Sequence, residues 1–202
     1  IVLISIDGVP AAALPMYGAR RTVTPAIDAL AAEAVVFDRA YAQSPLMVPA
    51  HPSILTGQLP IDHGVRDDAG FAMSRDAQTL AELLRNRGFA TGAAVSSFLL
   101  RPESGMAQGF TYFDAELPPD TTDAPPLERD GAQTIEAGEG WVQAQGDQRV
   151  FLFLQVDPAD ADVAVTRLRS LLKARDLYDH ATIVLVGDRG DPTAGLTLDD
   201  AT

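Results

Sequence analysis

The sequence contains no cysteine, which excludes disulfides, thiolate metal sites and cysteine nucleophiles. Long apolar runs are missing as well, since no segment approaches the ~18 residues that a membrane-spanning helix needs. Positive charge is scarce: 15 Lys and Arg stand against 28 Asp and Glu, and the formal net charge is −13. Because clustered cations provide most of the affinity for nucleic-acid backbones, nucleic acid is not an expected partner.

The remaining composition is that of a folded globular protein, with 47% hydrophobic and 21% charged residues. A length of 202 residues predicts a single domain over 1–202. The segment 117–129, rich in proline and acidic residues, is the best candidate for a linker within it. The chain begins with Ile1 rather than Met, so we expect that an N-terminal segment, including any signal peptide, was removed or is absent.

Strand-like and helix-like segments alternate along the chain. Apolar runs of strand length predict strands over 1–7, 35–42, 89–96, 150–157 and 181–188. Apolar residues at helical spacing, together with capping residues, predict helices that begin at Thr24-Pro25 and that lie within 44–57, 79–87, 132–145 and 161–172. This order is typical of an α/β fold with a mainly parallel sheet and helices on both of its faces.

Three of the predicted strands end in an aspartate, at Asp7, Asp157 and Asp188. The carboxyl ends of parallel strands form one edge of the sheet, where functional residues of such folds gather. Carboxylates there can bind a metal or act as general bases. The alternative is that each caps the next helix or forms a turn, and the sequence leaves both interpretations open.

Several motifs follow one another in an order that resembles a known family. They are ISID at 4–7, TPAIDALAAEAVVFDRAYAQSP at 24–45, HPSILTG at 51–57, HGVRDD at 63–68, GFTYFD at 109–114 and RDLYDHATIVLVGDRG at 175–190. The set resembles the sulfatase branch of the alkaline phosphatase superfamily, and in particular its bacterial sulfatase-like members. The resemblance implies a truncated or minimal sulfatase-like fold and a hydrolase of sulfate or phosphate monoesters. In that family a divalent metal (calcium, zinc, manganese or magnesium) activates a Cys-derived, Ser or Thr nucleophile at a helix N-terminus.

The nucleophile of that family does not match this sequence. Its motif frame is intact as Met47-Val48-Pro49-Ala50-His51, which places Met47 at the nucleophile position. A thioether has no proton to lose and is a poor ligand for hard cations. Ser44 and Ser53 are nearby but out of register, so no confident catalytic residue is predicted.

The family's metal and substrate residues match only in part. Asp7 and Asp188 correspond to metal ligands, but Arg189 stands in place of a ligand histidine and cannot offer a lone pair. Ala194 replaces a further histidine, and the family's substrate loop after 150–157 is deleted. Asp7 and Asp188 are therefore predicted remnants of a metal site in which the Arg189 guanidinium replaces the metal and bridges Asp7, with Asp188 as a second contact. The alternative is that Arg189 points to solvent.

Two residues, His51 and Arg66, remain as candidate anion contacts. His51 has an alternative role as a residue at a helix start that bonds to backbone, whereas His63 is predicted to be a turn residue and His180 a surface residue.

The leading functional hypothesis is a sulfatase-like pseudoenzyme with a structural or interaction role in a larger assembly that includes a protein partner. An active metal-dependent hydrolase of sulfate or phosphate monoesters is the competing hypothesis, and a carbohydrate-binding or anion-binding module is a third. The first predicts no cofactor, the second a divalent metal. The resemblance also implies a periplasmic or secreted, that is extracytoplasmic, location.

Overall fold

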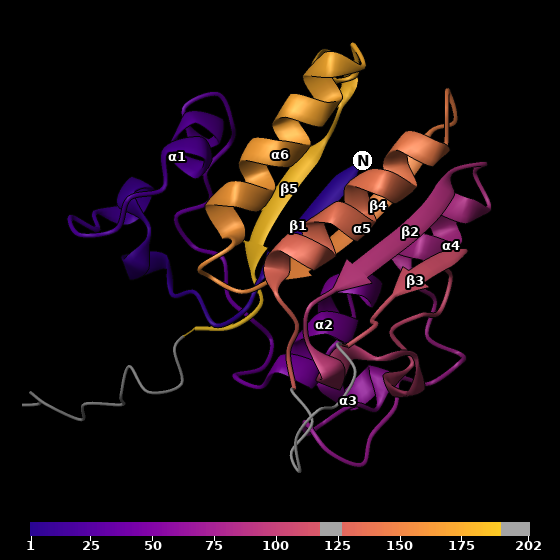
Figure 1. Ribbon diagram of the computed structural model, residues 1–202. Coiled ribbons are helices and arrows are strands. Elements are labelled where there is room, and N and C mark those ends of the chain that lie inside the picture. The colour runs from indigo at the N-terminus through magenta and orange to yellow at the C-terminus, as the bar shows by residue number, and fades with distance from the viewer. Residues whose placement is uncertain (118–126, 191–202) are drawn as a thin grey trace, which may run out of the picture.

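The computed structural model describes residues 1–117 and 127–190. Five parallel strands form one sheet in the order β3-β2-β4-β1-β5 (Figure 1). The strands are β1 (Val2–Ile6), β2 (Ala90–Val95), β3 (Tyr112–Asp114), β4 (Val150–Val156) and β5 (Ile183–Gly187). The predicted parallel sheet is confirmed, as are the strands expected within 1–7, 89–96, 150–157 and 181–188.

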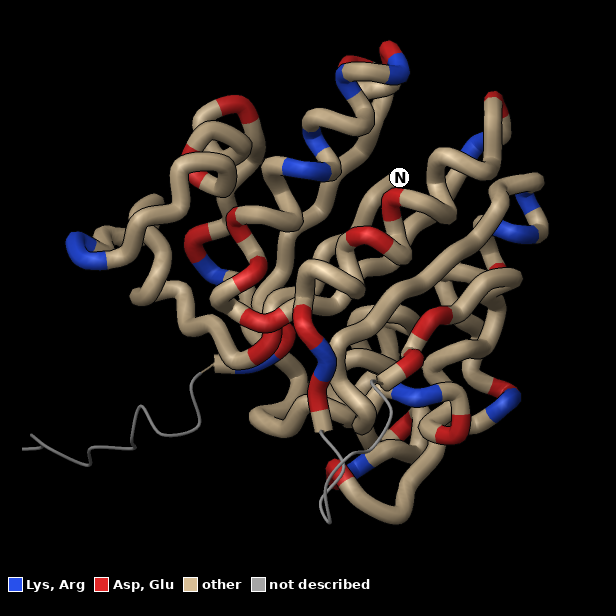
Figure 2. Tube along the Cα trace, in the orientation of Figure 1, with Lys and Arg blue, Asp and Glu red and all other residues tan. Residues whose placement is uncertain are grey.

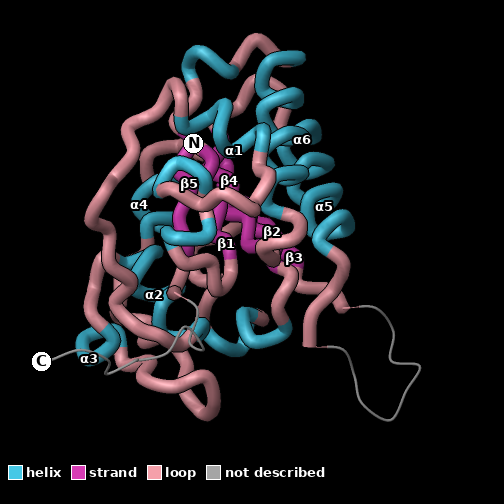
Figure 3. Tube along the Cα trace, turned by 90° about the vertical axis from the view of Figure 1, so that its left-hand side faces the viewer, coloured by secondary structure: helices cyan, strands magenta, loops and turns pink. Residues whose placement is uncertain are grey.

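Helices cover both faces of the sheet (Figure 3). One face carries α1 (Pro25–Ala31), α5 (Gly131–Ala144) and α6 (Ala161–Ala174), whose apolar residues pack with Ile4 and Leu154. The opposite face carries α2 (Met47–Thr56) and α4 (Leu80–Arg85), which pack with Leu3 and Phe153. A further short helix, α3 (Pro60–His63), follows α2. Successive strand residues therefore alternate between two cores, as expected for strands that are buried on both sides.

The predicted strand over 35–42 is wrong. This segment is irregular, and its large side chains are exposed: Val35 is 80%, Phe37 69% and Tyr41 78% accessible. Its apolar, β-branched composition suits a strand, but in the described part of the chain no neighbouring strand pairs with it. A strand without a partner cannot satisfy its backbone hydrogen bonds, and the segment stays outside the sheet.

The 117–129 linker prediction falls mostly on residues outside the described ranges. Over the residues that are described, none of the helices has the length and apolarity that crossing a membrane requires.

Candidate functional site

Acidic side chains gather at the carboxyl edge of the sheet, where red segments cluster in Figure 2. Three of these acids, Asp7, Asp157 and Asp188, directly follow the neighbouring strands β1, β4 and β5. Strand alternation continues past the strand ends, so all three lie on the α2 side, as do Ser5 and Gln155. The sequence prediction that these three aspartates share one edge is confirmed.

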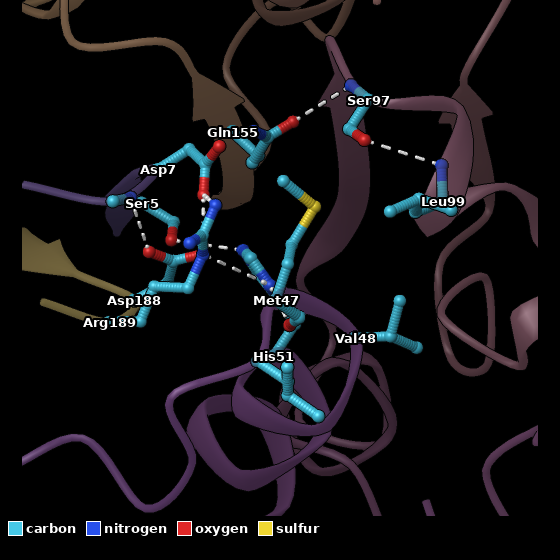
Figure 4. A network of polar contacts seen from close by, with 12 residues as sticks. Ser5, Asp7, Met47, Val48, His51, Ser97, Leu99, Gln155, Asp188 and Arg189 are labelled. Atoms are coloured by element: carbon cyan, nitrogen blue, oxygen red, sulfur yellow. Dashed lines mark hydrogen bonds and ion pairs between the residues drawn. The ribbon is translucent and has the colours of Figure 1, made fainter. Parts of the chain in front are cut away.

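Arg189 directs its guanidinium back onto Asp7 (Figure 4). Its Nε and Nη2 lie 3.0 Å and 2.8 Å from Asp7 Oδ1, and Nε lies 3.9 Å from Asp188 Oδ2. The two partners are largely shielded, with side-chain exposures of 18% for Arg189 and 12% for Asp7. The expected contact between Arg189 and Asp7 is therefore present. The alternative, that the Arg189 side chain points to solvent, is wrong. The contact with Asp188 lies at the limit of an ion pair.

Asp188 is the most buried of these acids, at 1% exposure. Its Oδ1 accepts a hydrogen bond of 2.8 Å from the Gly8 backbone N–H. Burial raises the pKa of Asp188 to about 7, with a further contribution from the neighbouring Asp7 carboxylate. Burial, together with Glu128 and Asp7, likewise raises the pKa of Asp157 to about 6. Both carboxyl groups therefore hold their protons more tightly than exposed aspartates do, chiefly because burial disfavours the charged form.

A metal at the family's position, between Asp7 and Asp188, does not fit this set of residues. The Arg189 guanidinium contacts Asp7 at 2.8 Å and lies 3.9 Å from Asp188 on that side, and a permanent cation cannot serve as a ligand. Gly8, the residue after Asp7, has no side chain to offer. These residues therefore do not form a metal-binding site between Asp7 and Asp188.

Helix α2 begins at Met47, whose side chain is 5% exposed and packs in the core beside Leu3 and Phe153. One N–H of the first turn is bonded by a side chain of the protein itself, since Asp68 Oδ1 accepts a hydrogen bond of 2.8 Å from the Val48 N–H. A helix N-terminus attracts anions, and here a carboxylate of the same chain fills that role.

His51 lies one turn into α2 and is fully buried. Its Nδ1 is 2.8 Å from the Met47 carbonyl oxygen, so Nδ1 carries the proton and donates it, as the backbone-bonded interpretation of His51 predicted. Nε2 is then the acceptor for the Ser5 hydroxyl at 3.1 Å. Burial lowers the pKa of His51 to about 4, which keeps the ring neutral. A neutral, fully bonded imidazole holds α2 against β1.

The remaining histidines, His63 and His180, and Arg66 differ in burial and in their partners. His63 was predicted as a turn residue, yet it is fully buried at the end of α3, where its Nε2 lies 3.0 Å from Ser53 Oγ. The prediction failed because His63 ends a short helix that packs on α2, a tertiary contact that local sequence does not encode. His180 is exposed, as predicted. Arg66 is exposed in the loop after α3, and Ala194 lies outside the described residues.

Two polar residues at this edge were missed from the sequence. Glu128 joins Asp7 and Asp157, because the backbone around it bonds to the end of β2: Phe98 N–H to the Leu127 carbonyl, and Arg129 N–H to the Ser96 carbonyl. Gln155 is fully buried, and its Oε1 accepts hydrogen bonds from the Ser96 and Ser97 N–H groups. The one available signal for Gln155 was its polarity inside the apolar run 150–156.

The fold is similar to those of several solved structures. A phosphonate monoester hydrolase of Agrobacterium radiobacter aligns with a TM-score of 0.77 at 15% identity, covering 94% of this chain and 62% of that one. A protein in complex with its substrate D-glucosamine-2-N,6-O-disulfate aligns with a TM-score of 0.64 at 22% identity, covering 77% and 33%. At these identities the likeness concerns the fold.

Sequence relatives are sulfatases. The N-acetylglucosamine-6-O-sulfatase of Bacteroides thetaiotaomicron is 32% identical over 113 residues, which cover 56% of this chain and 19% of that protein. Human arylsulfatase A is 35% identical over 122 residues, covering 56% and 24%. The chain thus spans about a fifth of the length of these relatives.

The family model described as Sulfatase matches residues 1–157, well over half of the chain. That range includes β1, α2 and β4 and reaches Asp157 at the carboxyl edge. The chain belongs to the sulfatase family, within the alkaline phosphatase superfamily.

Proposed function

We propose that this chain is a sulfatase-like domain that has lost catalysis and serves a structural or protein-interaction role. The observation that carries the proposal is the Arg189 guanidinium at 2.8 Å and 3.0 Å from Asp7 Oδ1. A divalent metal in this family supplies charge to neutralise the anionic ester and to activate the nucleophile. A guanidinium supplies charge at Asp7, but it cannot activate a nucleophile by coordination.

The second support is Met47, which starts α2 where the family places its nucleophile. Covalent catalysis needs a hydroxyl, thiol, amine, carboxylate or similar group, and a buried thioether has none of these. Ser44 and Ser53 do not replace it, because both hydroxyls serve the local backbone. Ser44 Oγ accepts from Leu46 N–H, and Ser53 Oγ donates to the Pro49 carbonyl.

The combined losses argue against a variant mechanism. Removing one transition-state contact costs about 10²–10³ in rate. In this chain Met47 stands at the nucleophile position and Arg189 at a metal-ligand position, so two parts of the family's chemistry are missing together. A protein partner within a larger assembly, and an extracytoplasmic location, complete the proposal. The family supports the extracytoplasmic location. A sulfatase-like fold that has lost its catalytic residues supports the interaction role.

The proposal is tested by assaying the purified chain on 4-nitrophenyl sulfate and 4-nitrophenyl phosphate, with and without calcium, zinc, manganese and magnesium. We expect the rate to equal that of Asp7→Asn under every condition. The competing function, an active metal-dependent hydrolase, requires metal-dependent turnover that survives repurification and is lost in Asp7→Asn. That result would overturn the proposal.

A further inference from the structure

The side chain of His63 connects α3 to α2, two helices that lie side by side (Figure 1). It is fully buried, and its Nδ1 lies 3.2 Å from the Val65 backbone nitrogen. Its Nε2 lies 3.0 Å from Ser53 Oγ, which in turn donates to the Pro49 carbonyl oxygen of α2. Both ring nitrogens are thus bonded to groups of the same chain.

The two hydrogen bonds of His63 fix the position of the ring proton. A backbone N–H can only donate, so Nδ1 accepts from Val65 and carries no proton. The single proton of the neutral ring is therefore on Nε2, which donates it to Ser53 Oγ. A second proton would enter at Nδ1, where it would point at the Val65 N–H and break that hydrogen bond. The ring keeps both bonds only while it is neutral.

His51, the other fully buried histidine, is bonded in the opposite sense. Its proton is on Nδ1, and its Nε2 accepts from the Ser5 hydroxyl. A hydroxyl can also accept, so protonation of His51 reverses this bond and does not break it. Of the two buried rings, His63 is the one with a donor-only partner at the nitrogen that a second proton must occupy.

The irregular segment 64–78 leaves α3 at His63 and returns to it, since the Ser74 N–H donates to the His63 carbonyl oxygen at 3.3 Å. The buried part of the segment forms a small apolar cluster with α2, made up of Val48, Val65, Met73 and Ala77. Most of its other residues are exposed. A segment with so little buried apolar surface opens at a lower free energy than the sheet, so loss of a hydrogen bond to His63 favours its opening.

The charged groups around His63 give a protonated ring little compensation. Asp62, its neighbour on α3, is exposed, and the other titratable group on α2 is the neutral His51. The charged residues of segment 64–78 are exposed or half-buried, and they are Arg66, Asp67, Asp68, Arg75 and Asp76. Burial therefore outweighs the Asp62 charge and lowers the pKa of His63 below its ordinary value of 6.5.

We propose that His63 is an acid-sensitive switch, which keeps segment 64–78 closed on α2 while its ring is neutral and releases the segment when the ring takes up a second proton. The open form has an exposed ring that takes up this proton near pH 6.5, whereas the closed form resists it. Below pH 6.5 the ratio of open to closed form therefore increases by about tenfold at most for each pH unit. Opening uncovers the apolar cluster, and it does so whether or not the chain is catalytic.

Amide hydrogen exchange of the native chain at pH 7, 6 and 5, corrected for the intrinsic effect of pH, tests the inference. We expect the protection of the Val65 and Ser74 amides to decrease by up to about tenfold per pH unit and to stay below that of the β4 amides, which marks local opening. His63→Gln, whose side chain is polar but cannot be charged, should remove this pH dependence. His180→Gln, which removes an exposed histidine, is the matched control and should respond as the native chain does.

Constant protection of the Val65 and Ser74 amides from pH 7 to pH 5 would overturn the inference, as would an equal decrease in His63→Gln. A decrease that is lost in His51→Gln but kept in His63→Gln would overturn it as well, because the other buried ring would then be responsible. If His63→Gln does not fold, the ¹⁵N chemical shifts of the native His63 ring at pH 7 decide. They should show the proton on Nε2, and a proton on Nδ1 would contradict the switch.

Discussion

Arg189 contacts Asp7 closely and Asp188 at longer range, so its removal leaves two shielded acids without their shared counter-charge. We expect Arg189→Ala to lower the free energy of unfolding by about 2–4 kcal/mol, measured by urea denaturation at pH 7 in EDTA. Arg189→Lys, which keeps the charge but loses the forked geometry, should lose less. A change in Arg189→Ala that is no larger than in Arg189→Lys would contradict a bridging role for the guanidinium.

The buried His51 should make the stability of the fold depend on pH. Its pKa is about 4 in the folded chain and 6.5 when exposed, because burial disfavours the charged ring. Between pH 6.5 and pH 4 the unfolded chain gains a proton at His51 that the folded chain does not, so this residue lowers stability as the pH falls. The stability of the native chain relative to His51→Gln should decrease over that window and be constant above pH 7. A difference that does not vary with pH would contradict a buried neutral imidazole.

The sequence predicted the meeting of Asp7 and Arg189 because both follow strands, and parallel strands end at one edge. It did not predict Glu128, which reaches the edge only because backbone bonds tie its irregular segment to β2. The aspartates that directly follow strands were thus predictable, whereas Glu128 in a loop and Gln155 inside the apolar run of β4 were not.

At the scale of elements, α4 (Leu80–Arg85) begins with a capping box formed by Thr79 and Glu82. Thr79 Oγ1 accepts from Glu82 N–H at 3.1 Å, and Glu82 Oε2 accepts from Thr79 N–H at 2.9 Å. We expect Thr79→Ala to destabilise the fold by about 1–2 kcal/mol, since the hydroxyl also donates to the Gln108 carbonyl. Thr79→Ser keeps the hydroxyl and is the control. Equal chemical-denaturation midpoints for Thr79→Ala and Thr79→Ser would rule out the capping contribution.

The 35–42 segment shows where an element could not be predicted. Its β-branched and aromatic residues suit a strand, but strand formation also depends on a pairing neighbour, which the segment's own sequence does not specify. The strands β1 and β4 lie inside the sheet and were predicted from their continuous apolar runs, because burial on both faces leaves that signature.

At the scale of the whole molecule, catalysis requires the nucleophile and the metal site together. We expect Met47→Thr alone to hydrolyse 4-nitrophenyl sulfate no faster than the native chain, because a hydroxyl without an activating metal remains a weak nucleophile. Substrate turnover by Met47→Thr that depends on Asp7 would show that Arg189 does not block the metal position.

Anomalous diffraction from manganese-soaked crystals of the chain tests whether Arg189 takes the place of the family's metal at Asp7. This replacement predicts the Arg189 guanidinium within salt-bridge distance of Asp7 and no anomalous peak between Asp7 and Asp188. A manganese ion between Asp7 and Asp188, with Arg189 displaced from Asp7, would contradict it.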